Sequence, residues 1–422
     1  MQRAPSPRVP AAALRLEQAR VAGGAERGVS RAAHRLIGAV CRLRSEPLRV
    51  AVPLLIACAY ATPAQAGDPA VATRVVIEGA RSAPAGLTQS ALPARFKAVA
   101  EARVEGSILP APVADRAGKL LVVTSTRHLL QLGQDGALEW SRTLPGFPTS
   151  SVVVTSDGTR VIATSEGLFG VDASGEERFL ARSFANPRPV QLVALPDGSL
   201  ALNLVHQVFK VSPRGRLLDR ASFNTAVAEV VRGEGQLLIA LGNTVYGWRP
   251  PAPPRKLTTL PTAVRGLTPR GRQLFALGGA GTTRTELFEI DLPTSTHHRR
   301  WELEGVHVTR YAVLPNQATL SIAAAGLLVH HDKEGSERSR SVPVPVTGTG
   351  PVVAPLVLID ASGRLAFASD GTGIGVVRPG GATTRQDELS CPSYAGLVEL
   401  GPDRYALVCS SGLVRFLRGE RR

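Results

Sequence analysis

Two pairs of histidines are the side chains in this sequence best suited to metal binding. His297 and His298 stand beside a turn, and His330 and His331 precede Asp332. Imidazole and carboxylate groups are common ligands of divalent transition metals. Adjacent residues of a β-strand, however, point to opposite faces of the sheet, so His330 and His331 cannot readily share one ion. The pattern favours solvated or packed histidines, and we expect no metal site.

The common catalytic motifs are absent from the sequence. It contains no GxSxG nucleophile elbow, no HExxH zinc motif and no GK[ST] phosphate loop. Glycine-rich segments at 278–286 and 369–375 each link two strands and open no helix. Without a helix N-terminus there is no aligned set of N–H groups for a phosphate. We therefore predict that the chain is not an enzyme.

The charge of the chain is unevenly distributed. Its formal net charge is +15, but the first 66 residues hold ten Arg and only three acidic residues. Residues 67–422 carry a net charge of +8, which we interpret as scattered, since there is no run of Lys and Arg and no aromatic platform for bases. Hydrophobic residues make up 44% of the chain, enough for a globular core. These features argue against disorder of the whole chain and against a nucleic-acid partner.

The N-terminal region has the pattern of a secretory signal peptide at residues 40–66. Basic residues precede an apolar stretch from Val50 to Tyr60, and the small-residue sequence Ala64-Gln65-Ala66 follows. The apolar stretch is too short to cross a bilayer, so we expect no transmembrane segment in the mature chain. We interpret residues 1–39 as a disordered extension or one added by a wrong start codon, with translation beginning near Val40.

A second interpretation of the same leader remains open. Leu55-Ile56-Ala57-Cys58 resembles the lipobox of bacterial lipoproteins, in which the cysteine carries the lipid. Cleavage after Ala66 predicts a periplasmic or secreted protein, and lipidation of Cys58 predicts an outer-membrane lipoprotein. Both place the mature chain outside the cytoplasm.

Beyond the leader the chain retains two of its four cysteines, Cys391 and Cys409. In an oxidising compartment such an isolated pair predicts a disulfide. An ideal hairpin centred near Pro402 would place Cys409 opposite about residue 395. The chain before Tyr394 must then fold back, because a bridge needs Cα atoms within roughly 7 Å.

A turn recurs along the chain about every 41 residues, between two short apolar strands. Its central residues are Gly118, Gly158, Gly198, Gly235, Gly271, Gln317, Gly363 and Asp403. Asp-Gly, Ser-Gly and Arg-Gly pairs supply the positive φ that tight hairpins need. A second turn follows most of them. A period near 40 with four short strands per unit is typical of β-propeller blades.

The repeats predict an all-β fold: a β-propeller of four-stranded antiparallel blades at residues 95–422, with eight blades favoured and seven as the alternative. The last unit ends after its third strand, which would leave an exposed edge. Residues 95–104, RFKAVAEARV, alternate apolar positions and can donate the missing strand. We predict that they pair with Gly412 to Arg418, and that residues 67–94 form a linker.

The sequence LLQLGQDGALEW has an Asp135-Gly136 turn, with Trp140 four residues after the glycine. It resembles the repeat of PQQ-like (quinoprotein-like) β-propellers, a family that includes the outer-membrane-protein assembly lipoprotein. The resemblance covers about residues 110–418 and weakens along the chain, since Phe179 and then Asp219 stand at the position of Trp140. It implies a propeller outside the cytoplasm, with a role in envelope assembly.

Related quinoproteins hold PQQ between a tryptophan floor and a disulfide of adjacent cysteines. Here the three tryptophans, Trp140, Trp248 and Trp301, fall in different repeats, and no two cysteines are adjacent. We therefore expect neither PQQ nor another cofactor.

Propellers bind partners at the mouth of the central channel, on loops that join the second strand to the third or one blade to the next. The candidate binding residues on these loops are Arg127, His128, Arg188, His206, Asn243, Arg284, His307, Arg310, Asp370 and Tyr394. Cations predominate, which favours a protein or an acidic or polyanionic envelope partner. We predict a monomeric, non-catalytic binding scaffold; the alternative is a periplasmic propeller enzyme, such as a sugar lyase, a hydrolase or a degenerate quinoprotein.

Overall fold

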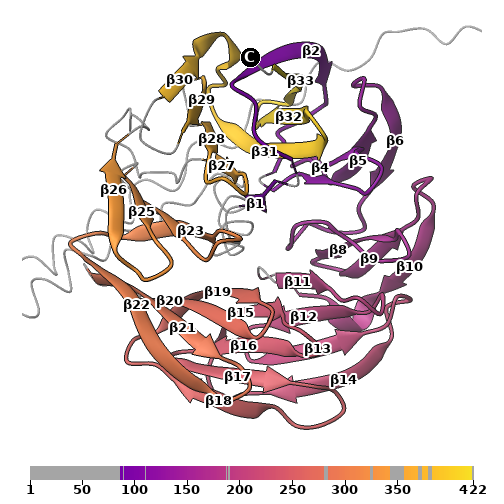
Figure 1. Ribbon diagram of the computed structural model, residues 1–422. Coiled ribbons are helices and arrows are strands. Elements are labelled where there is room, and N and C mark those ends of the chain that lie inside the picture. The colour runs from indigo at the N-terminus through magenta and orange to yellow at the C-terminus, as the bar shows by residue number, and fades with distance from the viewer. Residues whose placement is uncertain are drawn as a thin grey trace, which may run out of the picture. The chain divides into compact units, whose positions relative to one another are not determined.

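Every strand described in the computed structural model belongs to one of eight small sheets (Figure 1). The structure describes residues 86–88, 90–109, 111–186, 188, 191–279, 284–323, 327–342, 356–368, 373–378 and 383–420. The predicted extension, the predicted signal peptide with Cys58, and most of the predicted linker lie outside these residues. Among the described residues, no helix is long and apolar enough to span a membrane.

The first four blades follow one another along the chain. Blade 1 holds β3 (Val113–Ala114), β4 (Leu120–Val123), β5 (His128–Leu132) and β6 (Leu138–Thr143). Blade 2 holds β7 (Val153–Val154), β8 (Arg160–Thr164), β9 (Gly167–Val171) and β10 (Glu177–Ala181). Blade 3 holds β11 (Gln191–Ala194), β12 (Leu200–Leu204), β13 (Gln207–Val211) and β14 (Leu217–Ser222). Blade 4 holds β15 (Val227–Arg232), β16 (Leu237–Leu241), β17 (Thr244–Trp248) and β18 (Arg255–Thr259).

The last four blades return toward the first. Blade 5 holds β19 (Val264–Arg270), β20 (Gln273–Gly278), β21 (Arg284–Asp291) and β22 (Thr296–Glu304). Blade 6 holds β23 (Val308–Val313), β24 (Thr319–Ala323), β25 (Leu328–His331) and β26 (Glu337–Ser341). Blade 7 holds β27 (Leu356–Ile359), β28 (Leu365–Ala368), β29 (Ile374–Val377) and β30 (Thr383–Gln386). Blade 8 holds β31 (Tyr394–Gly401), β32 (Arg404–Cys409), β33 (Leu413–Glu420) and β2 (Arg95–Arg103). The prediction of eight antiparallel blades is confirmed.

Eight apolar clusters lie between neighbouring blades and close the ring. In β4, Leu120 and Val122 pack toward blade 8, whereas Leu121 and Val123 pack toward blade 2. Successive side chains of a strand point to opposite faces, so a strand between two neighbouring blades buries side chains on both faces. This explains why the middle strands of the blades are mostly apolar on both faces, with few polar side chains such as Lys210 and Glu286 among them.

The predicted closing strand is confirmed. Strand β2 pairs antiparallel with β33, with Phe96 opposite Gly419 and Arg103 opposite Leu413. In Figure 1 the indigo β2 lies beside the yellow strands of blade 8. Phe96 is 2% exposed and its ring meets the Tyr405 ring edge-on, with centroids 5.1 Å apart. The first and last segments of the propeller therefore share one sheet.

A short strand that the sequence did not predict precedes this closure. Strand β1 (Gly86–Leu87) pairs in parallel with β27, the inner strand of blade 7. As the chain crosses toward blade 8, the Leu92 N–H donates to Asp360 Oδ2 of blade 7 (2.9 Å), and the Ser90 N–H donates to Glu399 Oε1 of blade 8 (3.2 Å). The segment before β2 is thus tied to both blades.

The central residues of the recurring turn adopt the predicted left-handed conformation in all eight repeats. Their φ angles range from +55° at Gly271 to +83° at Gly363. The non-glycine members fit the same pattern, with +65° at Gln317 and +57° at Asp403. The two repeats with Gln317 and Asp403 in place of glycine therefore form the same turn.

Trp140 fastens blade 1 to blade 2. Its Nε1–H donates to Ala173 O (3.0 Å), and its ring lies over the turn at Gly175, whose φ is +82°. A Cβ atom on Gly175 would stand 2.6 Å from Trp140 Cδ2. Phe179 packs on Gly215 of blade 3 in the same way. The aromatic residue of the repeat is therefore a contact between blades.

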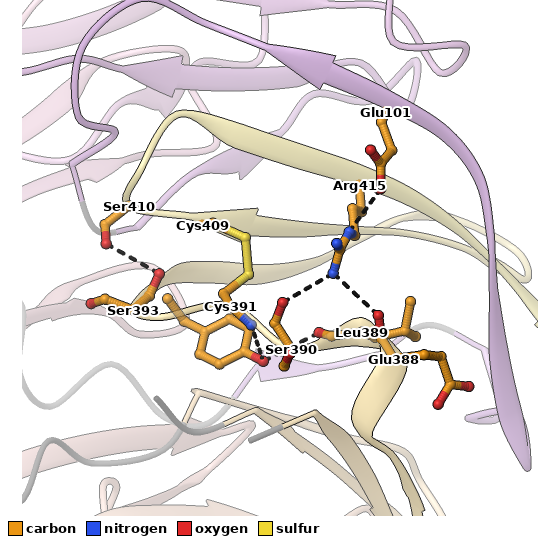
Figure 2. The surroundings of a disulfide bond; sticks show 10 residues. Glu101, Glu388, Leu389, Ser390, Cys391, Ser393, Cys409, Ser410 and Arg415 are labelled. Carbon is orange, nitrogen blue, oxygen red and sulfur yellow. Dashed lines mark hydrogen bonds and ion pairs between the residues drawn. A yellow bond between two sulfur atoms is a disulfide. The ribbon is translucent and has the colours of Figure 1, made fainter. Parts of the chain in front are cut away.

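The predicted disulfide between Cys391 and Cys409 is present, with 5.7 Å between the Cα atoms. Figure 2 shows how the chain before blade 8 folds back to reach it. Arg415 donates to Ser390 O (3.0 Å) and Glu101 Oε1 (2.8 Å), which joins this bend to β2. Both cysteines are buried, so the bridge belongs to the core of blade 8.

Replacing Gly175 with alanine should destabilise the ring more than the same change at Gly235. Both glycines have positive φ, but a Cβ on Gly235 meets nothing within 4 Å. The backbone conformation alone should lower the free energy of unfolding by about 1–2 kcal/mol, and the Trp140 clash at Gly175 should add about 1–3 kcal/mol. Denaturant unfolding of both variants measures the difference. Equal losses would contradict the docking role of Trp140.

Removing residues 86–104 should leave β33 as an unpaired edge and expose the core beneath Phe96. We expect aggregation or loss of cooperative thermal unfolding, because exposed edges recruit other strands. A chain that lacks only residues 1–66 serves as the control and should melt cooperatively. If the variant without residues 86–104 stays monomeric and melts at the temperature of the control, the stability of the ring does not require β2 as its closing strand.

Candidate functional site

The predicted binding residues lie toward one end of the blades. Because neighbouring strands run antiparallel, the loops that join second to third strands share one face with those that join blades. We call this the upper face; the turns that join the first strand to the second and the third to the fourth form the lower face. The loops of the upper face contain Arg127, Arg188, His206, Asn243 and His307. The residues His128, Arg284 and Tyr394 begin strands β5, β21 and β31 at the same face. Asp370 lies outside the described residues.

Arg310 is placed differently from its prediction. It lies within β23, the inner strand of blade 6, and not in a loop. Its side chain is largely buried against the neighbouring strands, and this burial lowers the pKa of its guanidinium group. The loop prediction failed because β23 begins at Val308, immediately after the interblade loop.

Tyr394 supports the disulfide and does not form part of a rim. It is only 8% exposed. Its hydroxyl accepts a hydrogen bond from the Cys391 N–H (2.9 Å) and donates to Leu389 O (3.2 Å). These contacts hold the bend that brings Cys391 back to Cys409, so its role is structural.

Arg284 is engaged in an ion-pair network at the upper end of blade 5. Its guanidinium lies 2.7 Å from Glu286 Oε1 and 2.7 Å from Glu302 Oε1. Arg299 contacts the same two carboxylates, at 3.1 and 2.5 Å. Burial alone would raise the pKa of the Glu286 carboxyl, but hydrogen bonds from the two arginines lower it below its ordinary value. Arg284 therefore neutralises a buried carboxylate instead of presenting a free cation.

Arg265, which the sequence analysis did not select, holds His307 at the top of blades 5 and 6. Arg265 Nη1 lies 2.5 Å from His307 Nε2, and Nη2 donates to Val308 O (3.3 Å). Burial lowers the pKa of His307, and the neighbouring guanidinium lowers it further. The neutral imidazole can then accept the hydrogen bond, which makes this pair a link between two inner strands.

The remaining predicted residues do not converge on one site. Asn243 Nδ2 donates to Leu260 O (2.9 Å) and so ties its loop to the interblade segment that follows β18. Arg188 and His206 are exposed in loops before and within blade 3. Among the described residues, the structure shows no channel-mouth cluster that unites the predicted set. That they act together in binding stays a prediction.

His330 and His331 lie on opposite faces of β25, as the sequence predicted. His330 is half-buried, whereas His331 is 2% exposed and stacks on Trp301, with ring centroids 4.8 Å apart. Burial lowers the pKa of His331 to about 4. In the part of the chain that the structure describes, no three His, Cys, Asp or Glu side chains gather where they could hold a metal.

In the part of the chain that the structure describes, three open grooves lie between neighbouring blades. One of about 450 Å³ separates blades 8 and 1, near Asp135 and Arg404, and one of about 370 Å³ separates blades 7 and 8, near Gln386 and Arg415. The third, of about 600 Å³, opens between blades 4 and 5. The predicted channel-mouth residues line none of them.

Phe147 is the most exposed aromatic contact on the upper face, and the sequence analysis missed it. The side chain is 62% exposed, and Arg127 Cζ lies 5.5 Å from its ring centroid. Two hydrogen bonds fix its loop to blade 2: Phe147 N–H to Ser165 Oγ (3.1 Å) and Ser165 N–H to Phe147 O (2.8 Å). The ring is thus presented to solvent from a fixed backbone.

The repeats themselves mark Phe147 as unusual. Ser125 N–H donates to Ser107 O and Gly279 N–H to Ala263 O, as Ser165 N–H does to Phe147 O, so these loops correspond. The interblade loops therefore carry Ser107, Phe147 and Ala263 at one structural position. Aligning the interblade loops by the number of residues after the preceding turn would have revealed, from the sequence alone, that Phe147 is the aromatic residue at this position.

No protein-family model matches the sequence, and no curated protein sequence matches it. Among solved structures, BamB from Moraxella catarrhalis superposes with a TM-score of 0.58 at 15% identity, covering 78% of this chain and 99% of that chain. Sqt1 from Saccharomyces cerevisiae gives a TM-score of 0.58 at 11% identity, covering 77% of this chain and 99% of the other. The Dos1 propeller gives 0.57 at 10% identity, covering 78% and 95%. These likenesses show the propeller fold.

The pKa of His331 predicts a stability loss in acid. The unfolded chain binds a proton near pH 6.5, whereas the folded chain binds it only near pH 4, so stability falls as the pH drops through this window. The loss should be on the order of 3 kcal/mol when complete. His331→Phe keeps a ring on Trp301 but cannot titrate, so its unfolding free energy should fall less between pH 7 and pH 4. Identical pH profiles for both proteins would refute the assignment.

Proposed function

We propose that this protein is a non-catalytic propeller scaffold that binds a partner protein through the upper face of blades 1 and 2. The observation that carries the proposal is Phe147, an exposed aromatic side chain held on a fixed loop. Aromatic and arginine side chains contribute most to protein interfaces, and a preformed backbone lowers the entropy cost of binding. Arg127 stands beside the ring and completes this pair.

The surroundings of Phe147 extend the contact surface across blade 2. A Cβ atom on Gly146 would stand 2.7 Å from Glu166 Cγ, so Glu166 packs directly beside the loop. Arg182 lies 3.7 Å from Glu166, with 70% of its side chain exposed. An exposed ion pair of this kind contributes little to stability and can exchange partners. Arg127, Phe147, Glu166 and Arg182 thus form an apolar centre with a charged rim, the usual arrangement of a binding surface.

We further propose that the protein acts outside the cytoplasm, in the assembly of the bacterial envelope. The buried disulfide in blade 8 supports an oxidising compartment, because such bridges persist there. The leader pattern at residues 40–66 and the resemblance to PQQ-like propellers support the same compartment. Anchoring through Cys58 and release after Ala66 are both compatible with it.

The replacement Phe147→Ser, which inserts the residue that the preceding interblade loop carries at this position, tests the proposal. Quantitative mass spectrometry of proteins captured from envelope extract should show at least tenfold less partner on the variant, because the apolar centre of the interface is gone. Leu138→Ser is the matched control, since Leu138 is 56% exposed on the outer strand of blade 1. It should capture the partner normally.

Equal capture by the wild-type and Phe147→Ser proteins would reject this surface. Turnover of sugars, alcohols or polyuronates by the purified protein, abolished by replacing one acid or histidine, would reject the scaffold in favour of the propeller enzyme.

A further inference from the structure

The largest of the three grooves lies on the lower face, between blades 4 and 5, on the side opposite Phe147. The lower-face turns of both blades form its walls. The lining includes Arg249, Arg255 and Arg272, the apolar residues Ala252, Pro253, Leu292 and Pro293, and one acidic residue, Glu234. Each of the three arginines is exposed, and the structure shows no ion pair to any of them among the described residues.

The other two grooves differ in the charge balance of their linings. The groove between blades 7 and 8 is lined by three basic and three acidic residues, and one of these pairs, Arg415 with Glu101, is in contact (2.8 Å). The groove between blades 8 and 1 is lined by two basic residues, Arg404 and Arg418, and two acidic residues. Both linings are therefore electrically balanced, whereas the groove between blades 4 and 5 has three arginines against one glutamate.

The sequence shows the same concentration of charge, which corrects our interpretation of the excess as scattered. Residues 207–272 contain eleven Lys and Arg but three Asp and Glu, a net charge of +8. The rest of residues 67–422 carries 28 of each kind and is neutral. The whole positive excess after the predicted leader therefore lies in the segment that builds this side of the ring.

We propose that this groove binds an acidic segment of a partner protein, one that interrupts its Asp and Glu residues with apolar side chains. Guanidinium groups pair with carboxylates in a planar, two-point geometry. The proline and leucine wall provides apolar contacts, and the lining contains no aromatic side chain on which a nucleic-acid base could stack. A Cβ on Gly235 or Gly271 would meet nothing within 4 Å, so the backbone of a ligand can approach both turns.

The test is a fluorescence-anisotropy titration of the full chain with a labelled twelve-residue peptide in which Asp and Glu alternate with Leu and Gly. The triple variant Arg249→Gln, Arg255→Gln, Arg272→Gln should bind it at least tenfold more weakly. The difference in affinity between the wild-type protein and this variant should shrink at high salt, because the screening length falls from about 8 Å at physiological ionic strength to about 3 Å at 1 M salt. Arg214→Gln, Arg216→Gln, Arg220→Gln is the control: it removes three exposed cations from blade 3 and should weaken binding less than threefold.

Absence of peptide binding to the wild-type protein, or equal losses in both triple variants, would overturn the proposal. Tighter binding of tripolyphosphate or of phosphatidylglycerol vesicles than of the peptide would overturn it as well, since it would identify a phosphate ligand. Phe147→Ser should leave peptide binding unchanged, because the groove and the upper face are separate surfaces. A negative result for peptide binding in the groove would therefore not reject the proposed partner-binding surface around Phe147. A negative result for Phe147→Ser would likewise not reject the groove.

Discussion

Every blade must bury both of its faces, and this requirement shapes the whole ring. A four-stranded sheet whose middle strands are apolar on both sides has no stable solvated state, so each blade needs two neighbours. The alternation of Leu120 and Leu121 toward blades 8 and 2 shows this need within a single strand. Only a closed ring supplies two neighbours to all eight blades, and it closes because β2 completes the sheet of β33.

This constraint draws polar residues into structural roles. Side chains of the inner strands reach the backbone of the next blade: Gln191 binds Val230, Glu229 accepts the Leu267 N–H, and Arg265 donates to Val308 O. Burial raises the pKa of Glu229 well above its ordinary value, since one backbone hydrogen bond does not offset the loss of water. Charged and polar residues near the channel therefore tie blades together, and their chemical type alone does not identify a binding site.

Departures from the repeat distinguish the surfaces that remain available. One interblade loop carries Phe147 where corresponding loops carry Ser107 and Ala263, and one interblade groove is lined by three arginines and one glutamate where the linings of the other two are balanced in charge. The two surfaces lie on opposite faces of the ring and differ in chemistry, since one is aromatic and the other cationic. A scaffold with two such surfaces can hold two partners at once without competition between them.

The repeat, the eight-bladed ring and its closing strand could be predicted from the sequence, because turn residues and alternating strands are local signals that each unit repeats. The disulfide was predictable because the chain after the leader retains an isolated pair of cysteines. The sequence also predicted that His330 and His331 point to opposite faces of their strand. Three roles became visible only in the folded ring: Arg284 binds Glu286, Tyr394 supports the disulfide, and Arg310 lies within a strand. The physical reason is that these roles depend on partners from other strands or on the exact end of a loop. Whether a polar side chain is free or already paired is set by what the closed ring places beside it.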